Sequence, residues 1–219
     1  MTPGTVLFDL FGVLACPQST DGRQRLVRTA GVPAPDFWDA YWAVRPPYDR
    51  GETDGPGYWR QVADRVGTRF DDRRIAALIA TDIASWSAVD GTMVALVEEL
   101  AARGRRIGLL SNIPEELARH YASHHAWLGH FDVCAFSCRI GHAKPDPAAY
   151  HWCQRALSDP PHRILFVDDR QENVRAAEAT GMRGHLFTTP ARLRDRLDRW
   201  DAGEGGPDPL GRRRPPTPG

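Results

Sequence analysis

The sequence of 219 residues lacks an excess of charge of either sign. Its 28 lysine and arginine residues are balanced by 28 aspartate and glutamate residues, so the formal net charge is zero. Such a chain has no overall field that would attract nucleic acid or an anionic membrane. We therefore expect neither of these partners, and any charge-dependent function must be confined to a local site.

Paired cysteines and long apolar runs are also missing. The four cysteines form no CxxC pair and have no histidine partners at zinc-finger spacing. They are interpreted as small apolar side chains in a reducing compartment. No run approaches the ~18 apolar residues that a membrane helix needs, and the first ten residues show no signal-peptide pattern. These absences favour a cytoplasmic protein.

Lysine is nearly absent. Lys144 is the single lysine of the chain, and every other basic residue is arginine. If the position required only surface charge, arginine would be the expected residue. A lone lysine within the sequence KPDP indicates a need for a compact positive charge, such as one that contacts phosphate oxygens.

What the sequence does contain is an alternation of short apolar segments with amphipathic ones. The apolar segments have the length and composition of strands that are covered on both faces. They predict strands at residues 5–10, 106–110, 133–137, 164–167 and 184–187, with helices at 92–103, 114–128, 147–157 and 172–180. This order predicts an α/β fold with a doubly wound parallel sheet.

Two regions do not fit the alternation. Residues 16–89 have helical patterns and many aromatic side chains, so they predict a helical module inserted between a core of residues 1–15 and 90–200. Residues 201–219 are rich in Gly, Pro and Arg and are predicted to form a disordered tail.

Polar side chains follow the predicted strands. They are Asp9 after the first strand, Ser111 after the second, Lys144 after the third, and Asp168 with Asp169 after the fourth. Because ligands of parallel α/β sheets bind beyond the carboxyl ends of the strands, we expect these groups to converge. Three carboxylates in one small site require compensation, which a divalent cation and a lysine supply. Oxygen ligands of this kind suit Mg²⁺.

Four segments resemble, in order, the four motifs of the haloacid dehalogenase (HAD) superfamily: FDLFGVL, LLSN, GHAKPDPAAY and ILFVDDRQEN. The helical insert resembles the cap that this superfamily carries between its first two motifs. The stretch RPPYDRG and the later GPGYW resemble the cap of the sugar-phosphatase and epoxide-hydrolase-N-terminal branch. The resemblance implies a Rossmann-like core with a helical cap.

The resemblance also implies roles for single residues. Asp9 matches the nucleophile that forms an aspartyl phosphate. Ser111 and Lys144 match the groups that contact the transferring phosphoryl group. The implied Mg²⁺ ligands are Asp9, the backbone carbonyl of Phe11, Asp168 and Asp169.

Substrate-binding residues are less well defined. Asn112 and Asn173 match positions that shape the loops of the site, and Asn112 is also a candidate substrate ligand. Arg45 and Trp42 in the insert are further candidates, for an anionic group and a stacking surface. The alternatives are that Arg45 is a solvated arginine and that Trp42 belongs to the apolar stripe of a helix.

One position departs from the superfamily pattern. Most of its phosphatases have a second aspartate two residues after the nucleophile, where this chain has Phe11. That aspartate protonates the leaving oxygen, and such help is worth about 10²–10⁴-fold. One interpretation is a phosphatase whose proton donor comes from another part of the chain. Asp49, Glu52 and Asp54 in the insert are candidates for that donor.

Three other functions remain open. One is a 2-haloacid dehalogenase, which has an aromatic residue at this position but lacks the acidic pair. Another is a weak or inactive enzyme that serves as a binding or regulatory protein. The third is a phosphonate hydrolase, which usually needs a second lysine. We expect a Mg²⁺-dependent phosphatase of a small phosphorylated metabolite, monomeric or homodimeric.

Overall fold

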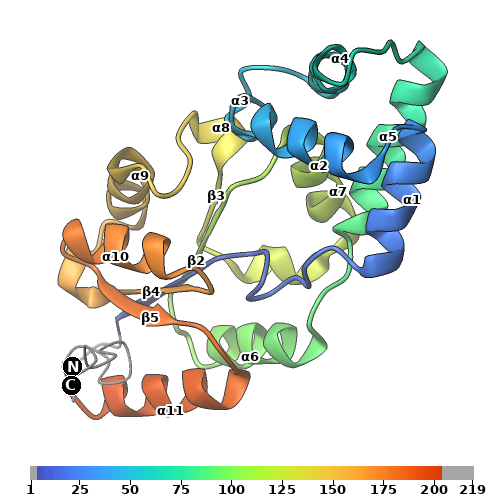
Figure 1. Ribbon diagram of the computed structural model, residues 1–219. Coiled ribbons are helices and arrows are strands. Elements are labelled where there is room, and N and C mark those ends of the chain that lie inside the picture. The colour runs from blue at the N-terminus through green and yellow to red at the C-terminus, as the bar shows by residue number, and fades with distance from the viewer. Residues whose placement is uncertain (1–3, 204–219) are drawn as a thin grey trace, which may run out of the picture.

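The computed structural model describes residues 4–203 and contains one parallel sheet of five strands (Figure 1). The strand order is β3-β2-β1-β4-β5. The strands are β1 Thr5–Phe8, β2 Ile107–Ser111, β3 Val133–Phe136, β4 Ile164–Asp168 and β5 Arg183–Leu186. The predicted parallel α/β fold is therefore confirmed, with each strand within two residues of its expected place.

Eleven α-helices and two short 3-10 helices complete the described part of the chain. The α-helices are α1 Thr20–Ala30, α2 Ala34–Ala43, α3 Arg45–Asp49, α4 Gly55–Arg65, α5 Asp72–Ser85, α6 Gly91–Ala102, α7 Glu115–His124, α8 Ser137–Ile140, α9 Pro147–Leu157, α10 Gln171–Ala179 and α11 Pro190–Asp201. The 3-10 helices are η1 Ala126–His130 and η2 Pro161–Arg163. Over residues 4–203, none of the helices combines the length and the apolar character that crossing a membrane demands.

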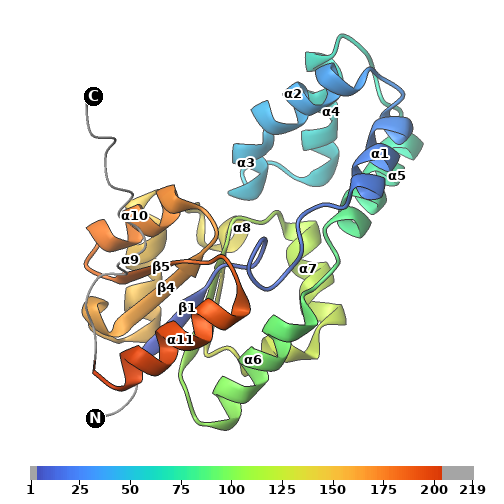
Figure 2. The same cartoon turned by 60° about the horizontal axis from the view of Figure 1, so that its bottom comes forward.

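Helices cover both faces of the sheet, which explains why its strands are apolar throughout (Figure 2). On one face α6, α7 and α11 pack through residues such as Leu96, Leu117 and Leu193. On the other face α9 and α10 pack through Tyr150 and Ala177. Strands β1, β2 and β4 are fully buried, as expected for central parallel strands.

Helices α1 to α5 lie between β1 and α6 in the chain and pack on one another (Figure 2). They have an apolar core of their own, centred on the fully buried Tyr41, Tyr58 and Trp59. This helical layer sits beyond the end of the sheet at which β1 leads into α1. It is thus placed to cover whatever the strand ends carry.

Four expectations about elements need correction. Strand β1 ends at Phe8 rather than at residue 10, because the carbonyl of Leu10 accepts the backbone N–H groups of the following tight turn. The predicted helix 114–128 breaks at His125, whose extended backbone lets η1 bury Trp127 and Leu128.

The other two corrections concern the C-terminal region. Helix α11 was not predicted, since its sequence is dominated by charged residues. Asp201, the first residue of the predicted tail, is the last residue of that helix and pairs with Arg105 at 2.6 Å. The rest of the predicted tail, from residue 204, lies outside the described residues.

Candidate active site

The two strands that carry the first aspartates are neighbours at the centre of the sheet. The register pairs Phe8 of β1 with Val167 of β4, so Asp9 and Asp168 follow side by side. The chain builds β2 and β3 on one side of β1 and then crosses to build β4 and β5 on the other. The carboxyl ends of β1 and β4 therefore lie at the point where the strand order switches direction, which is where parallel α/β folds bind their ligands.

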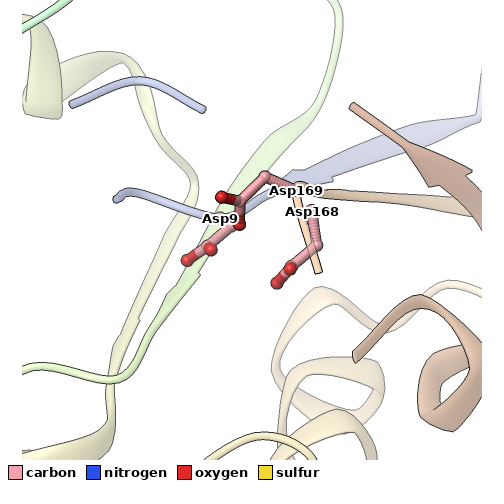
Figure 3. Close-up of side chains that lie close together, drawn as sticks. All are labelled: Asp9, Asp168 and Asp169. Carbon is pink, nitrogen blue, oxygen red and sulfur yellow. The ribbon is translucent and has the colours of Figure 1, made fainter. Parts of the chain in front are cut away.

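Three carboxylates gather at this point (Figure 3). Asp9, Asp168 and Asp169 each offer an oxygen, and these oxygens lie within 4.8 Å of one another. Asp168 is fully buried, Asp9 is 6% exposed, and Asp169 is open to solvent. The set could hold a small cation that prefers oxygen ligands, because one open and two buried carboxylates leave room for water and substrate.

Lys144 provides the positive charge inside the site. Its Nζ lies 2.5 Å from Asp9 Oδ1 and 2.8 Å from Asp168 Oδ2, and the side chain is almost fully buried. Burial by itself lowers the pKa of a lysine, but the two carboxylates reverse this and raise the pKa of Lys144. Burial, opposed by Lys144, raises the pKa of Asp9 above its ordinary range. Lys144 therefore stays charged.

Two asparagines fix these charged groups. Asn173 Nδ2 donates to both carboxylate oxygens of Asp168 at 3.0 Å. Asn112 donates to the Lys144 carbonyl and accepts from the Lys144 N–H, both at 2.8 Å. Both polar atoms of the Asn112 side chain thus hold the loop that carries Lys144. Asn112 therefore positions Lys144 and also lines the pocket.

Ser111 lies at the carboxyl end of β2 with no exposed surface. Its Oγ makes no hydrogen bond to any residue in the part of the chain that the structure describes. A buried hydroxyl without a partner costs about 1–3 kcal/mol. Such an atom at this edge of the sheet is a donor that a ligand would satisfy.

The turn after β1 brings backbone close to Asp169. Gly12 has a φ of +89°, and a Cβ built on it would lie 2.2 Å from Asp169 Oδ2. Glycine is therefore required both by the backbone conformation and by the space that Asp169 occupies. Phe11, just before it, turns its ring into an aromatic cluster, with centroids 4.8 Å from Trp86 and 5.8 Å from Tyr121.

These groups border a pocket of about 260 Å³ between the sheet and the helical layer. Its lining residues are Asp9, Phe11, Gly12, Pro17, Trp42, Arg45, Asp49, Trp86, Asn112, Lys144, Asp169, Arg170 and Asn173. Of the residues proposed from sequence, Ser111 and Asp168 are absent from this lining because they are completely buried. The proton-donor candidates Glu52 and Asp54 do not border it either, whereas the remaining proposed site residues, Asp49 among them, do.

Arg45 and Trp42 reach the pocket from the helical layer. Arg45 is not a solvated arginine: it is 5% exposed, and its Nε and Nη1 pair with Asp49 at 2.7 Å and Asp82 at 3.3 Å. Trp42 has 48% of its surface exposed, unlike any other large apolar side chain among residues 4–203. It therefore does not belong to the packed stripe of its helix and instead presents a ring to the pocket.

The sequence did not point to Trp86 as a lining residue. It directly follows α5, where the insert returns to the core, and carries no motif. Its position in the chain, just where the insert rejoins the core, is the one available signal. Trp86 and Phe11 together make one wall of the pocket apolar.

Comparisons with known proteins show which family the chain resembles in sequence. The sequence profile of the haloacid dehalogenase-like hydrolases matches residues 3–181. The chain is 29% identical over 140 residues to the sesquiterpene phosphatase astK of Aspergillus oryzae, covering 64% of this chain and 70% of that protein. It is 33% identical over 115 residues to a phosphoglycolate phosphatase of Cereibacter sphaeroides, covering 52% of each. The chain thus spans about half the length of that second relative.

Solved structures share the fold. The HAD family enzyme BT-2542 of Bacteroides thetaiotaomicron, in complex with magnesium and inorganic phosphate, has a TM-score of 0.69 at 16% identity, over 87% of this chain and 98% of its own. An L-2-haloacid dehalogenase of Xanthobacter autotrophicus has a TM-score of 0.64 at 17% identity, over 95% and 86%. With the profile match over most of its length, this chain belongs to the haloacid dehalogenase-like hydrolase family.

Proposed function

We propose that this chain is a Mg²⁺-dependent phosphatase that hydrolyses a phosphate monoester of a small metabolite. The observation that carries the proposal is the grouping of Lys144 with three carboxylates beside a buried, unpartnered hydroxyl. Phosphatases are among the relatives, and a solved structure with this fold holds magnesium and phosphate.

The residues present fit the metal. Asp9, Asp168 and Asp169 would hold Mg²⁺ together with the Phe11 carbonyl, and an all-oxygen set is the one that Mg²⁺ prefers. When bound, the ion would neutralise charge on the phosphoryl oxygens. Because Lys144 pairs with both Asp9 and Asp168, the charges of these buried carboxylates are compensated whether or not the metal is bound.

The chain's own residues then carry the reaction. An Asp9 oxygen attacks phosphorus, and the bond from phosphorus to the ester oxygen breaks, so the phosphoryl group passes to Asp9. Lys144 Nζ and Ser111 Oγ stabilise the charge that develops on the phosphoryl oxygens. Water then attacks phosphorus, releases inorganic phosphate and restores the Asp9 carboxylate.

The pocket limits the substrate. Its volume of about 260 Å³ is slightly below the roughly 300–1,000 Å³ that is usual for ligand sites. Phe11, Trp42 and Trp86 contribute apolar surface to its lining in addition to the charged groups. We infer a compact phosphate monoester whose leaving group has an apolar face, held under the helical layer as under a cap.

A second candidate follows from Phe11. Without a proton donor at that position, the protein would be a weak or inactive enzyme that binds a phosphorylated ligand. A 2-haloacid dehalogenase is disfavoured, because such chemistry has no use for the carboxylate pair Asp168 and Asp169.

One experiment separates these functions: phosphate release from a panel of phosphate monoesters with and without Mg²⁺, beside chloride release from 2-haloacids. The proposal expects Mg²⁺-dependent phosphate release and no chloride. Chloride release without metal would establish the dehalogenase. Binding of phosphate esters without turnover would establish the binding protein.

A further inference from the structure

A carboxylate of the helical layer faces the same pocket as Asp9. Asp49 is the last residue of α3, and it lines the same pocket as Asp9, which follows β1. Its side chain is 17% exposed, so it is partly sheltered while it still reaches the cavity. Among the residues that border this pocket, Asp9, Asp49 and Asp169 are the acidic ones, and Asp49 alone lies outside the carboxylate cluster.

Asp49 is fixed to the core rather than carried on a free loop. Ser137 Oγ donates to the Asp49 carbonyl and accepts from the Ile113 N–H at 2.8 Å. Ile113 directly follows Asn112 of the pocket wall, so one serine ties Asp49 to the end of β2.

The turn after α3 is held against the core as well. A Cβ on Gly51 would lie 2.3 Å from the Cys138 carbonyl of α8, and its φ is +74°. The backbone of this turn therefore touches the core directly. The position of Asp49 relative to the sheet is set by the hydrogen bond from Ser137 to its carbonyl and by the close packing of the turn that follows it.

The surroundings of Asp49 favour a bound proton. Asp49 Oδ1 pairs with Arg45 Nε, and the same guanidinium serves Asp82, whose Oδ1 also accepts from Tyr41 Oη. The buried carboxylate of Asp82 and the partly buried carboxylate of Asp49 thus share one cation. Since a cluster with an uncompensated negative charge is costly in a poorly solvated site, one of the two carboxyls tends to hold a proton.

The two carboxyls differ in their access to the pocket. Burial raises the pKa of Asp49, although Arg45 and Arg50 act against it. Asp82 is 3% exposed and does not border the pocket. Asp49 Oδ2 makes no hydrogen bond to another residue within 4–203, so this oxygen remains for a ligand. A proton held by Asp49 and Asp82 together is therefore available to the pocket only through Asp49.

We propose that Asp49 is the general acid and base of this site and replaces the function that Phe11 lacks. The inference rests on the phosphatase function proposed above. As Asp9 attacks phosphorus, the Asp49 carboxyl gives its proton to the departing ester oxygen, which leaves as the alcohol. The Asp49 carboxylate then takes a proton from the attacking water as the bond between phosphorus and Asp9 breaks. Asp49 ends the cycle protonated.

The test compares substrates with different leaving groups. In Asp49→Asn, kcat/KM for glycerol phosphate, whose alkoxide needs a proton, should fall by about 10²–10⁴-fold. For 4-nitrophenyl phosphate, whose phenolate departs without a proton, it should fall by less than about 10-fold. Asparagine keeps the shape of the side chain and an oxygen for Arg45, so the fold should be retained.

Two variants serve as controls. Asp82→Asn is a positive control: it leaves Asp49 as the one carboxylate paired with Arg45 and removes the reason for Asp49 to hold a proton, so kcat/KM should fall more for glycerol phosphate than for 4-nitrophenyl phosphate. Glu52→Gln alters an exposed carboxylate in the turn after α3, and it should leave kcat/KM for both substrates unchanged.

Equal losses on both substrates in Asp49→Asn, or no loss, would overturn the assignment. If Asp9→Asn is inactive while Asp49→Asn lowers both substrates equally, the phosphatase function stands and only this inference fails. If the wild-type chain releases no phosphate from either ester, both fail.

Discussion

Lys144 Nζ bridges Asp9 Oδ1 at 2.5 Å and Asp168 Oδ2 at 2.8 Å, with all three side chains nearly or fully buried. This geometry accounts for the single lysine in a chain otherwise built with arginine. A planar guanidinium is wider than an ammonium and would not enter the space between two carboxylates that lie this close.

Lys144→Met should therefore destabilise the protein strongly. It removes the cation from two buried carboxylates, and breaking a buried ion pair in this way costs about 3–5 kcal/mol. Urea unfolding in metal-free buffer measures the loss. Adding Asp9→Asn removes one of the stranded charges and should restore part of the stability. A loss below about 1 kcal/mol in the single variant would mean that the carboxylates are not compensated by Lys144.

Asp9→Asn should abolish phosphate release. The amide is not a nucleophile toward phosphorus, but it keeps the volume of the side chain, so the variant should remain folded. Steady-state phosphate release with Mg²⁺ measures the effect, and circular dichroism checks the fold. Substantial residual activity would remove Asp9 from the nucleophile position.

The sequence predicted that the groups of the site converge because most of them stand at the end of a strand or directly after it. Asp9, Ser111 and Asp168 are tied to strand ends, and parallel strands bring those ends to one edge. Lys144 comes from a loop, yet its uniqueness singled it out.

The network around Arg45 could not be predicted in the same way. Asp49 and Asp82 lie on different helices, and no periodicity links them. Their meeting at one guanidinium depends on how α3 and α5 pack, which hydrophobic patterns do not specify. Helix α11 was missed for a related reason: most of its side chains are polar, and a few buried ones such as Leu193 and Leu197 attach it.

Glu116 should matter for the attachment of the helical layer to the core. Its carboxylate accepts from Tyr48 Oη at 2.9 Å and from the Gly55 N–H at 2.8 Å, so it joins α7 to α3 and α4. Glu116→Ala leaves the buried Gly55 N–H without this acceptor and should lower the free energy of unfolding by about 1.5–3 kcal/mol.

The neighbouring Glu115 is the matched control for that prediction. It pairs with Arg139 at 3.0 Å on the surface, so Glu115→Ala should cost only about 0–1 kcal/mol. Urea unfolding of the two variants side by side measures the difference. Equal losses in the free energy of unfolding would show that Glu116 does not attach the helical layer to the core.

Asp169→Asn should abolish the stabilisation of the folded protein by Mg²⁺. At 100 times its dissociation constant a ligand stabilises the folded state by about 2.7 kcal/mol, which is roughly 5–10 °C in the melting temperature of a chain of this size. Thermal unfolding with and without Mg²⁺ should show this shift in the wild type and in Asp195→Asn, an exposed control on α11. A full shift in Asp169→Asn would exclude this carboxylate as a ligand.

Phe11→Asp should rescue the Asp49→Asn variant. The new carboxylate would stand two residues after Asp9, where most family phosphatases have their proton donor, and it would make Asp49 dispensable. In the Asp49→Asn background, kcat/KM for glycerol phosphate should recover by at least ~10-fold, whereas 4-nitrophenyl phosphate should gain little. Phe11→Ala in the same background removes the same contacts with Trp86 and Tyr121 without supplying an acid, so it should give no recovery. Recovery with alanine as well would trace the effect to pocket shape and not to proton transfer.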